Sequence, residues 1–320
     1  MEPSKSPPHG KNKDTSNSNA TINMNADKNH ALIKDVFQSY DRVSNAKQIT
    51  KWFNRKMHID MKLNHTTKFN ASQLYYNLVA HDPKTKICSL RVDPFSEDLY
   101  FLTTDGNLNH MTHGLIQSKH IPVHKNLRMD IIPLGLGWIM ITNDTNKISS
   151  VEIHNPNEVK QHVLTEADEK ITDITFETLL NFIFFVTDTG VLYKYDVGDH
   201  VVTQLAKVDE PISVMDYDDE LNVVYFAGKR LYSYDVSSNR LVKIYDEGKS
   251  INALYLSDGI IYFADTALIK LTPNSLINTT ELVNYSSQMI HNFNNDVSCM
   301  AVSDKGIFVG INTSILLIPF

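Results

Sequence analysis

Six small polar residues recur along the chain, each as the second residue of a short run whose other members are mostly apolar. They are Ser89, Asp130, Thr172, Ser213, Asn252 and Ser298. Hydroxyl, amide and carboxyl groups brought to one place could orient a small ligand through hydrogen bonds. The pattern therefore predicts a ligand-binding ring at the mouth of a channel. The alternative is that these residues simply line the hydrated end of that channel.

A metal site would draw on the same residues. Calcium binds six to eight oxygen atoms and favours several carboxylates. The candidate ligands are Asp130, Asp173 and Asn252, and the other members of the ring offer only hydroxyls. This set is poor in carboxylates, and the chain has no Gly-rich phosphate loop, no Gly-x-Ser-x-Gly and no His-Glu-x-x-His. We therefore expect no catalytic residue, no metal and no cofactor.

A repeat of about forty residues must position this ring. The runs open at 88, 129, 171, 212, 251 and 297, which are 41, 42, 41, 39 and 46 residues apart. Each copy continues into an aromatic-rich run and then, in the clearest copies, into Leu-Tyr-x-Tyr-Asp. Short strands at this period, without helices, predict an all-β, six-bladed β-propeller over residues 72–320. The last copy lacks an outer strand, and we expect Ser72–Val79 to supply it and close the ring.

Aromatic residues recur at equivalent positions of the second and third strands. Phe184, Tyr225 and Tyr262 are examples. Such repetition is typical of the core between blades rather than of a ligand pocket. Cys88 and Cys299 open the first and last copies, and we expect two buried free thiols rather than a disulfide, because inner strands of neighbouring blades lie too far apart.

The region before the repeats has a different composition. Residues 1–28 are polar and almost free of apolar side chains, which predicts a disordered tail. Residues 29–71 are expected to form a helical extension and linker, since apolar residues between 29 and 57 recur at helical spacing. These helices are expected to cap the propeller; the alternative is that they dock a protein partner.

Composition and short motifs limit the partners and the compartment. The formal charge of −7 predicts no nucleic-acid surface, and no apolar stretch is long enough to span a membrane. Seven Asn-x-Ser/Thr sequons suggest a secreted glycoprotein, whereas no apolar signal segment follows the first residues. Secretion, with a different natural N-terminus, and a cytoplasmic location both stay open.

Three short motifs resemble those of known six-bladed propellers. Ile261–Asp265 is similar to the motif of the Tyr-Trp-Thr-Asp receptors, and Ile251–Leu254 resembles the opening run of the regucalcin and gluconolactonase type. The Leu-Tyr-x-Tyr-Asp strands most resemble the ommochrome-binding proteins of moths. That resemblance implies a secreted, non-enzymatic carrier of a tryptophan-derived pigment. The lactonase resemblance implies a metal-binding role for Asn252.

Three functions follow as hypotheses. The first is a non-enzymatic binding protein that carries a small, aromatic, pigment-like ligand at the channel mouth. The second is a metal-dependent, lactonase-type hydrolase that uses Asp130, Asp173 and Asn252. The third is a protein-interaction scaffold that binds a partner through the blade tops and residues 29–57.

Overall fold

The computed structural model describes most of the chain after residue 76. The described residues are 77–81, 85–92, 98–112, 115–120, 129–134, 137–144, 146–155, 158–177, 181–246, 249–257, 259–273, 285–293 and 295–320. The chain divides into two units, residues 1–47 and 48–320, and every described residue belongs to the second. The predicted tail (1–28), the extension (29–71) and its helices (29–57) lie outside the described residues.

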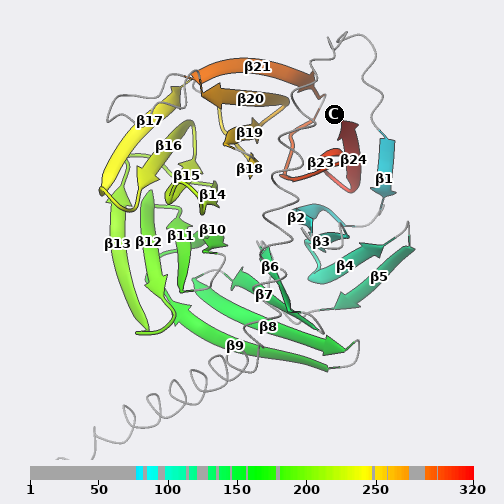
Figure 1. The fold of residues 1–320 in the computed structure, drawn as a ribbon. Helices are drawn as coiled ribbons and strands as arrows, with labels where there is room; N and C mark the ends of the chain where they lie inside the picture. Colours follow the sequence, from blue (N-terminus) through cyan, green and yellow to red (C-terminus); the bar gives the residue numbers. More distant parts are fainter. Residues whose placement is uncertain are drawn as a thin grey trace, which may run out of the picture. The chain divides into compact units, whose positions relative to one another are not determined.

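The described residues form an all-β ring of six four-stranded sheets, with no helix among them (Figure 1). Neighbouring strands in each sheet are antiparallel. In the five sheets of consecutive strands the first strand lies toward the middle of the ring and the last toward its rim. This arrangement is a β-propeller, so the predicted fold class is confirmed at that level.

Five of the sheets are built from four consecutive strands. The first two are β2–β5 (Ile87–Val92, Leu99–Thr103, Asn107–Thr112, Leu115–His120) and β6–β9 (Met129–Leu134, Gly137–Asp144, Lys147–Asn155, Glu158–Glu166). The next are β10–β13 (Ile171–Phe176, Phe182–Thr187, Val191–Asp196, Val201–Lys207) and β14–β17 (Val214–Asp218, Val223–Ala227, Arg230–Asp235, Arg240–Asp246). The last is β18–β21 (Ala253–Ser257, Ile260–Ala264, Ala267–Pro273, Tyr285–Asn292).

The sixth sheet combines two distant parts of the chain. Strands β22 (Cys299–Ser303), β23 (Gly306–Ile311) and β24 (Ser314–Pro319) are completed by β1 (Asn77–His81), which pairs antiparallel with β24. An N-terminal outer strand was predicted, although its described part begins at Asn77 and residues 72–76 lie outside the described range. Five sheets are therefore regular blades of consecutive strands, and the prediction of six blades counted the composite sheet as the sixth.

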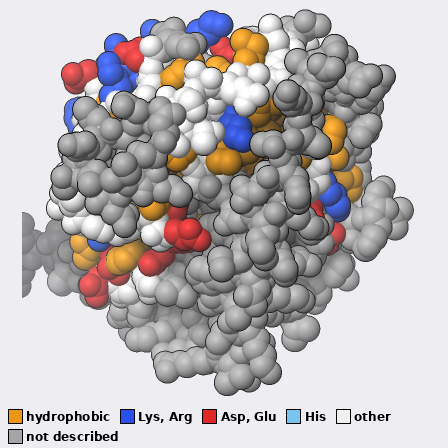
Figure 2. Space-filling model, turned by 45° about the horizontal axis from the view of Figure 1, so that its top comes forward, with side chains coloured by type: hydrophobic (Ala, Val, Ile, Leu, Met, Phe, Trp, Pro, Cys, Tyr) orange, Lys and Arg blue, Asp and Glu red, His pale blue; other side chains and the backbone are white. Residues whose placement is uncertain are grey.

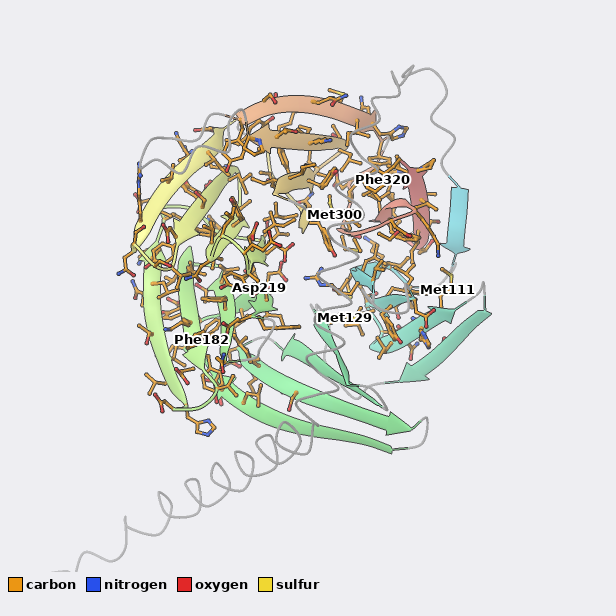
Figure 3. All side chains as sticks on the ribbon, viewed as in Figure 1. Met111, Met129, Phe182, Asp219, Met300 and Phe320 are labelled. Carbon is orange, nitrogen blue, oxygen red and sulfur yellow. The ribbon has the colours of Figure 1, made fainter. Side chains whose placement is uncertain are left out.

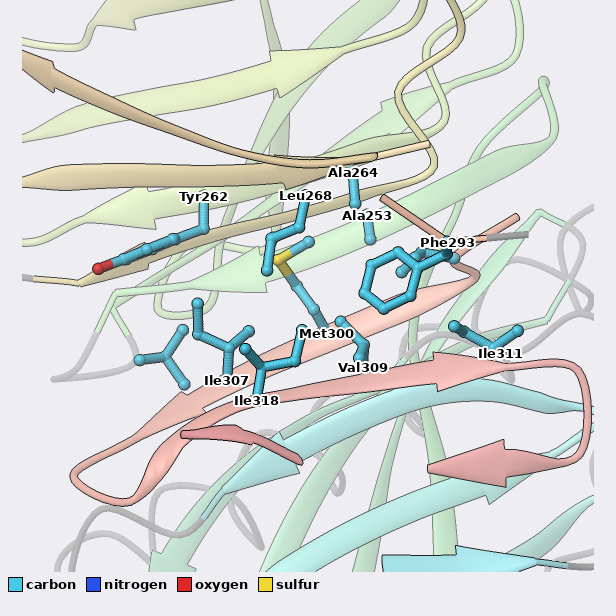
Figure 4. Packing of buried hydrophobic residues seen from close by; sticks show 12 residues of the cluster. Ala253, Tyr262, Ala264, Leu268, Phe293, Met300, Ile307, Val309, Ile311 and Ile318 are labelled. Carbon is cyan, nitrogen blue, oxygen red and sulfur yellow. The ribbon is translucent and has the colours of Figure 1, made fainter. Parts of the chain in front are cut away.

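The core lies between neighbouring sheets, as the repeated aromatics predicted. Phe184 from β11 and Phe226 from β15 share one buried cluster, with Met215 between their sheets. Figure 4 shows the corresponding cluster between the β18–β21 sheet and the composite sheet, where Met300 and Ile307 face Tyr262. Burial of such side chains stabilises each junction by roughly 2 kcal/mol per large apolar residue.

The Tyr-Asp pairs that end several strands shape the turns. The Oδ1 atom of Asp196 accepts the backbone N–H groups of Gly198 and Asp199, both at 2.9 Å. The hydroxyl of Tyr195 lies 2.7 Å from Nδ1 of His200, whose φ of 57° places it in the left-handed region. The same device recurs where Tyr234 donates to Asn239 and Tyr217 donates to Asn222. Each tyrosine therefore secures the strained residue five positions later.

Charged side chains do not form a single-sign surface on the face seen in Figure 2. Lys and Arg side chains are interspersed with Asp and Glu over its described part. Neither Cys88 nor Cys299 is in a disulfide, as predicted, but only Cys299 is buried, and Cys88 is half-buried. No helix within the described ranges is long and apolar enough to cross a membrane.

The buried tyrosines predict an alkaline unfolding transition. Burial, reinforced by a neighbouring aspartate, raises the pKa of Tyr195 and that of Tyr217 to about 12. Tyrosine in an unfolded chain ionises near pH 10, so the unfolded state releases protons first as the pH rises. The free energy of unfolding should therefore hold below about pH 10 and fall between about pH 10 and about pH 12. Urea unfolding measured across this pH range tests the prediction. A free energy of unfolding that stays constant from about pH 10 to about pH 12 would contradict the burial of these phenols.

Candidate functional site

Four members of the predicted polar ring share one position at the inner edge of their sheets. The hydroxyl oxygens of Thr172, Ser213 and Ser298 each lie near a carbonyl oxygen of the second strand of the same sheet, at 3.3, 3.3 and 3.1 Å. The backbone N–H of Asn252 donates to Ala264 at 2.9 Å, as that of Ser213 donates to Ala227. These residues are structurally equivalent, as the sequence spacing indicated.

Ser89 is shifted by one residue from this position. Its place is taken by Cys88, whose thiol donates to the carbonyl of Leu102 at 3.4 Å. Ser89 pairs with Leu102 across the strands, just as Asp173 pairs with Val186. The same pairing irregularity occurs between Ile171 and Asp173, so Ile87 is equivalent to Ile171, and the first copy begins one residue earlier than the spacing indicated.

Asp130 is displaced further. The N–H of Met129 donates to the hydroxyl of Ser89 at 3.3 Å, and the N–H of Met215 donates to Oδ2 of Asp173 at 2.9 Å. Met129 and Met215 are therefore equivalent, so Asp130 corresponds to Asp216 and lies outside the ring. The side chain of Asp130 is outside the described part of the structure.

Two of the ring hydroxyls connect neighbouring sheets. Ser213 donates to the carbonyl of Ile251 at 2.7 Å, and Ser298 donates to that of Ile87 at 2.8 Å. The second contact joins the composite sheet to the β2–β5 sheet. Since a hydroxyl has one proton, these donors are engaged by the scaffold rather than by a ligand.

Two carboxylates, the buried Asp173 and the half-buried Asp216, make similar connections. Asp173, only 6% exposed, accepts the N–H of Ile174 through Oδ1 at 3.0 Å as well as that of Met215. Asp216 accepts the N–H groups of Tyr217 at 3.0 Å and Leu256 at 2.8 Å. The innermost strand of each sheet has one edge with no neighbouring strand, and these carboxylates accept hydrogen bonds from backbone N–H groups on that edge.

A small pocket opens where the inner strands meet. It encloses about 280 Å³, part of it open to solvent. Its lining comes from β2, β10, β14, β18 and β22 and comprises Ser89, Arg91, Asp173, Val214, Ala253, Leu254, Cys299 and Met300. Figure 3 shows Met300 near the middle of the ring.

The pocket only partly matches the predicted site. Ser89 from the ring and Asp173 from the metal set line it, while Thr172, Ser213, Asn252 and Ser298 do not. The sequence analysis did not identify Arg91 as a pocket residue. In the strand pairing, Arg91 lies opposite an aromatic residue of the second strand, as do the equivalent residues Thr175, Asp216, Tyr255 and Ala301 of the other sheets. Arg91 is the one basic residue among these described positions. That contrast becomes visible only after the one-residue shift at Ser89 is corrected.

Among the described residues, no three His, Cys, Asp or Glu side chains gather as metal ligands would. Both oxygens of Asp173 already accept backbone N–H groups. No protein-family model matches the chain, and no curated protein is significantly similar to it. The fold and the pocket therefore define a β-propeller with a small, mixed polar and apolar site at its centre.

Proposed function

We propose that the protein is a non-enzymatic binding protein that holds a small aromatic ligand in the central pocket. The observation that carries this proposal is the lining of the pocket by five separate inner strands. A site assembled from distant parts of a rigid ring is pre-formed, which favours binding without rearrangement.

The chemistry of the wall supports an aromatic ligand. The apolar groups of the lining belong to Val214, Ala253, Leu254, Cys299 and Met300. Cys299 and Met300 are consecutive on β22 and belong to buried clusters with two different neighbouring sheets. Thioethers and thiols are polarizable and contact aromatic rings favourably. The Tyr-Asp pairs that resemble those of ommochrome-binding proteins serve turns in this chain, so the pocket is the stronger support for a carrier function.

Closure of the ring belongs to the same proposal. We infer that the composite sheet acts as a sixth blade and holds the inner strands in a fixed arrangement. Ile87, Leu90 and Phe101 of the first sheet pack with Cys299 and Phe308 of the composite sheet in one buried cluster. The Ser298–Ile87 hydrogen bond lies at the same junction. Without this junction the pocket would lose the fixed position of β22 relative to β2.

Calorimetric titration tests the binding function. The probes are indole-3-propionate and its uncharged amide, which have the same aromatic body. We expect at least one to bind with one-to-one stoichiometry, and Ala253→Leu to abolish that binding because the larger side chain fills the pocket. Ala206→Leu, on the outer strand β13, is the matched control and should bind as the native protein does.

Two results would contradict the proposed function. One is that neither indole binds to the native protein. The other is that a folded Ala253→Leu variant binds as tightly as the native protein does. A melting curve of each variant shows whether the protein is folded before it is titrated.

A further inference from the structure

We propose that Asn312 is an N-glycosylation site, at which the side-chain amide carries a glycan. This inference goes beyond the proposed binding function and does not depend on it, because it concerns a surface turn of the composite sheet. It follows from the conformation of Asn312, from the contacts of its side chain and from the two residues that come after it.

Asn312 lies in the short turn between β23 and β24, which the pairing of Ile311 with Ser314 closes. The asparagine is exposed, and its φ of 53° places it in the left-handed region. Its backbone carbonyl accepts the N–H of Ile87 at 2.7 Å, which ties the turn to the start of β2. The scaffold therefore holds the backbone of Asn312 and leaves its side chain exposed.

Three asparagines in the described ranges have left-handed φ values, and their side chains differ in what they contact. The Oδ1 atoms of Asn222 and Asn239 each accept the hydroxyl of the tyrosine five positions earlier, at 2.8 and 2.9 Å. Within the described part of the chain, no group is hydrogen-bonded to the side-chain amide of Asn312. Asn312 is thus the one of the three whose amide does not serve its turn.

The residues that follow Asn312 distinguish it in the same way. Asn312-Thr313-Ser314 is an Asn-x-Ser/Thr sequon, whereas neither Asn222 nor Asn239 has a serine or threonine two positions later. The other sequon asparagine within the described ranges is Asn143, which is paired with Ile148 inside strand β7. A glycan is bulky and hydrated, so an exposed turn accommodates it without displacing packed residues.

The modification is a group transfer from a lipid-linked oligosaccharide. The Nδ2 atom of Asn312 forms a bond to the anomeric carbon of the sugar and loses one proton. The bond from that carbon to the pyrophosphate of the donor breaks, and the pyrophosphate leaves with the lipid. Because this donor is used in the secretory compartment, the proposal requires that the chain enters that compartment.

Peptide mass spectrometry of the full chain from the cells that naturally make it tests the proposal. Trypsin cleaves after Lys305, so the peptide that begins at Gly306 carries Asn312 and no second sequon of the printed sequence. Treatment with peptide N-glycosidase in ¹⁸O-labelled water should convert Asn312 to an aspartate that carries the heavy oxygen. If this peptide were found unmodified before the treatment and unlabelled after it, the proposal would be overturned.

Substitutions identify the residue when the full chain is expressed with a cleavable secretory signal in cultured animal cells. Asn312→Asp and Ser314→Ala should each remove one glycan from the intact mass, while Ser314→Thr should keep it. Aspartate tolerates the left-handed region, so Asn312→Asp preserves the turn. Asn239→Asp is the matched control, since it changes a left-handed asparagine without a sequon, and it should keep every glycan. A folded Asn312→Asp protein with as many glycans as the native protein would show that Asn312 is not a glycosylation site.

Discussion

Removal of residues 1–81 lowers the free energy of unfolding by about 4 kcal/mol, because the truncated chain lacks β1. Four residue pairs join β1 to β24, from Asn77–Leu317 to His81–Ser314. Their loss leaves β24 as an open edge beside the junction at which the ring closes. Urea unfolding followed by tryptophan fluorescence measures the change, and sedimentation detects the association that a raw edge promotes.

A shorter truncation is the control for this effect. Removal of residues 1–47 keeps β1, and it should leave the unfolding midpoint of the propeller nearly unchanged. If the chain lacking residues 1–81 unfolded at the same urea concentration as the chain lacking residues 1–47, β1 would not be part of the closing sheet.

Replacement of Asp173 by alanine lowers the free energy of unfolding by about 3 kcal/mol. The carboxylate accepts the N–H groups of Ile174 and Met215, and both of these residues are buried. Without Asp173 these two donors have lost their acceptor at the inner edge, and each such loss costs roughly 1–3 kcal/mol. Because Met215 belongs to the next sheet, the junction between the two sheets is weakened directly.

Asp209→Ala removes an equal charge from an exposed residue of the loop after β13, and it should change stability by less than about 0.5 kcal/mol. The comparison separates the effect of the hydrogen bonds from that of net charge. An Asp173→Ala protein as stable as the Asp209→Ala protein would show that the carboxylate does not hold the two sheets together.

The fold class could be predicted from the sequence because a repeat of short strands at a period of about forty residues is typical of a β-propeller. Aromatic residues such as Phe184 and Phe226 recur at equivalent positions, and they pack together between sheets. The N-terminal closing strand was also predictable, since a sheet of three strands with an exposed edge is unfavourable. The composite sheet accordingly draws its strands from both ends of the described region, as the incomplete last copy indicated.

The site was harder to predict, for a local reason. The first copy begins at Ile87 rather than at Cys88, which moves Ser89 out of the ring position and Arg91 into line with Asp216. Ile87 and Cys88 are both apolar, so the sequence pattern alone did not show which of them opens the run. Small polar residues were also assigned to a ligand, whereas Ser213 and Ser298 bond to backbone carbonyls of the neighbouring sheets. A buried backbone carbonyl needs a hydrogen-bond donor, and a small polar side chain can supply that donor without any ligand.

The most direct test of the central pocket is the NMR spectrum of protein labelled with ¹³C at the methionine methyl groups. Met300 lines the pocket, whereas Met289 is 63% exposed on the outer strand β21. The Met300 signal therefore reports on the pocket, and the Met289 signal reports on the outer rim of the ring. Met300→Leu and Met289→Leu assign the two signals. Addition of indole-3-propionate should shift the Met300 signal in a saturable manner and leave the Met289 signal in place. An unmoved Met300 signal at saturating probe, or equal shifts of both signals, would contradict binding in the central pocket.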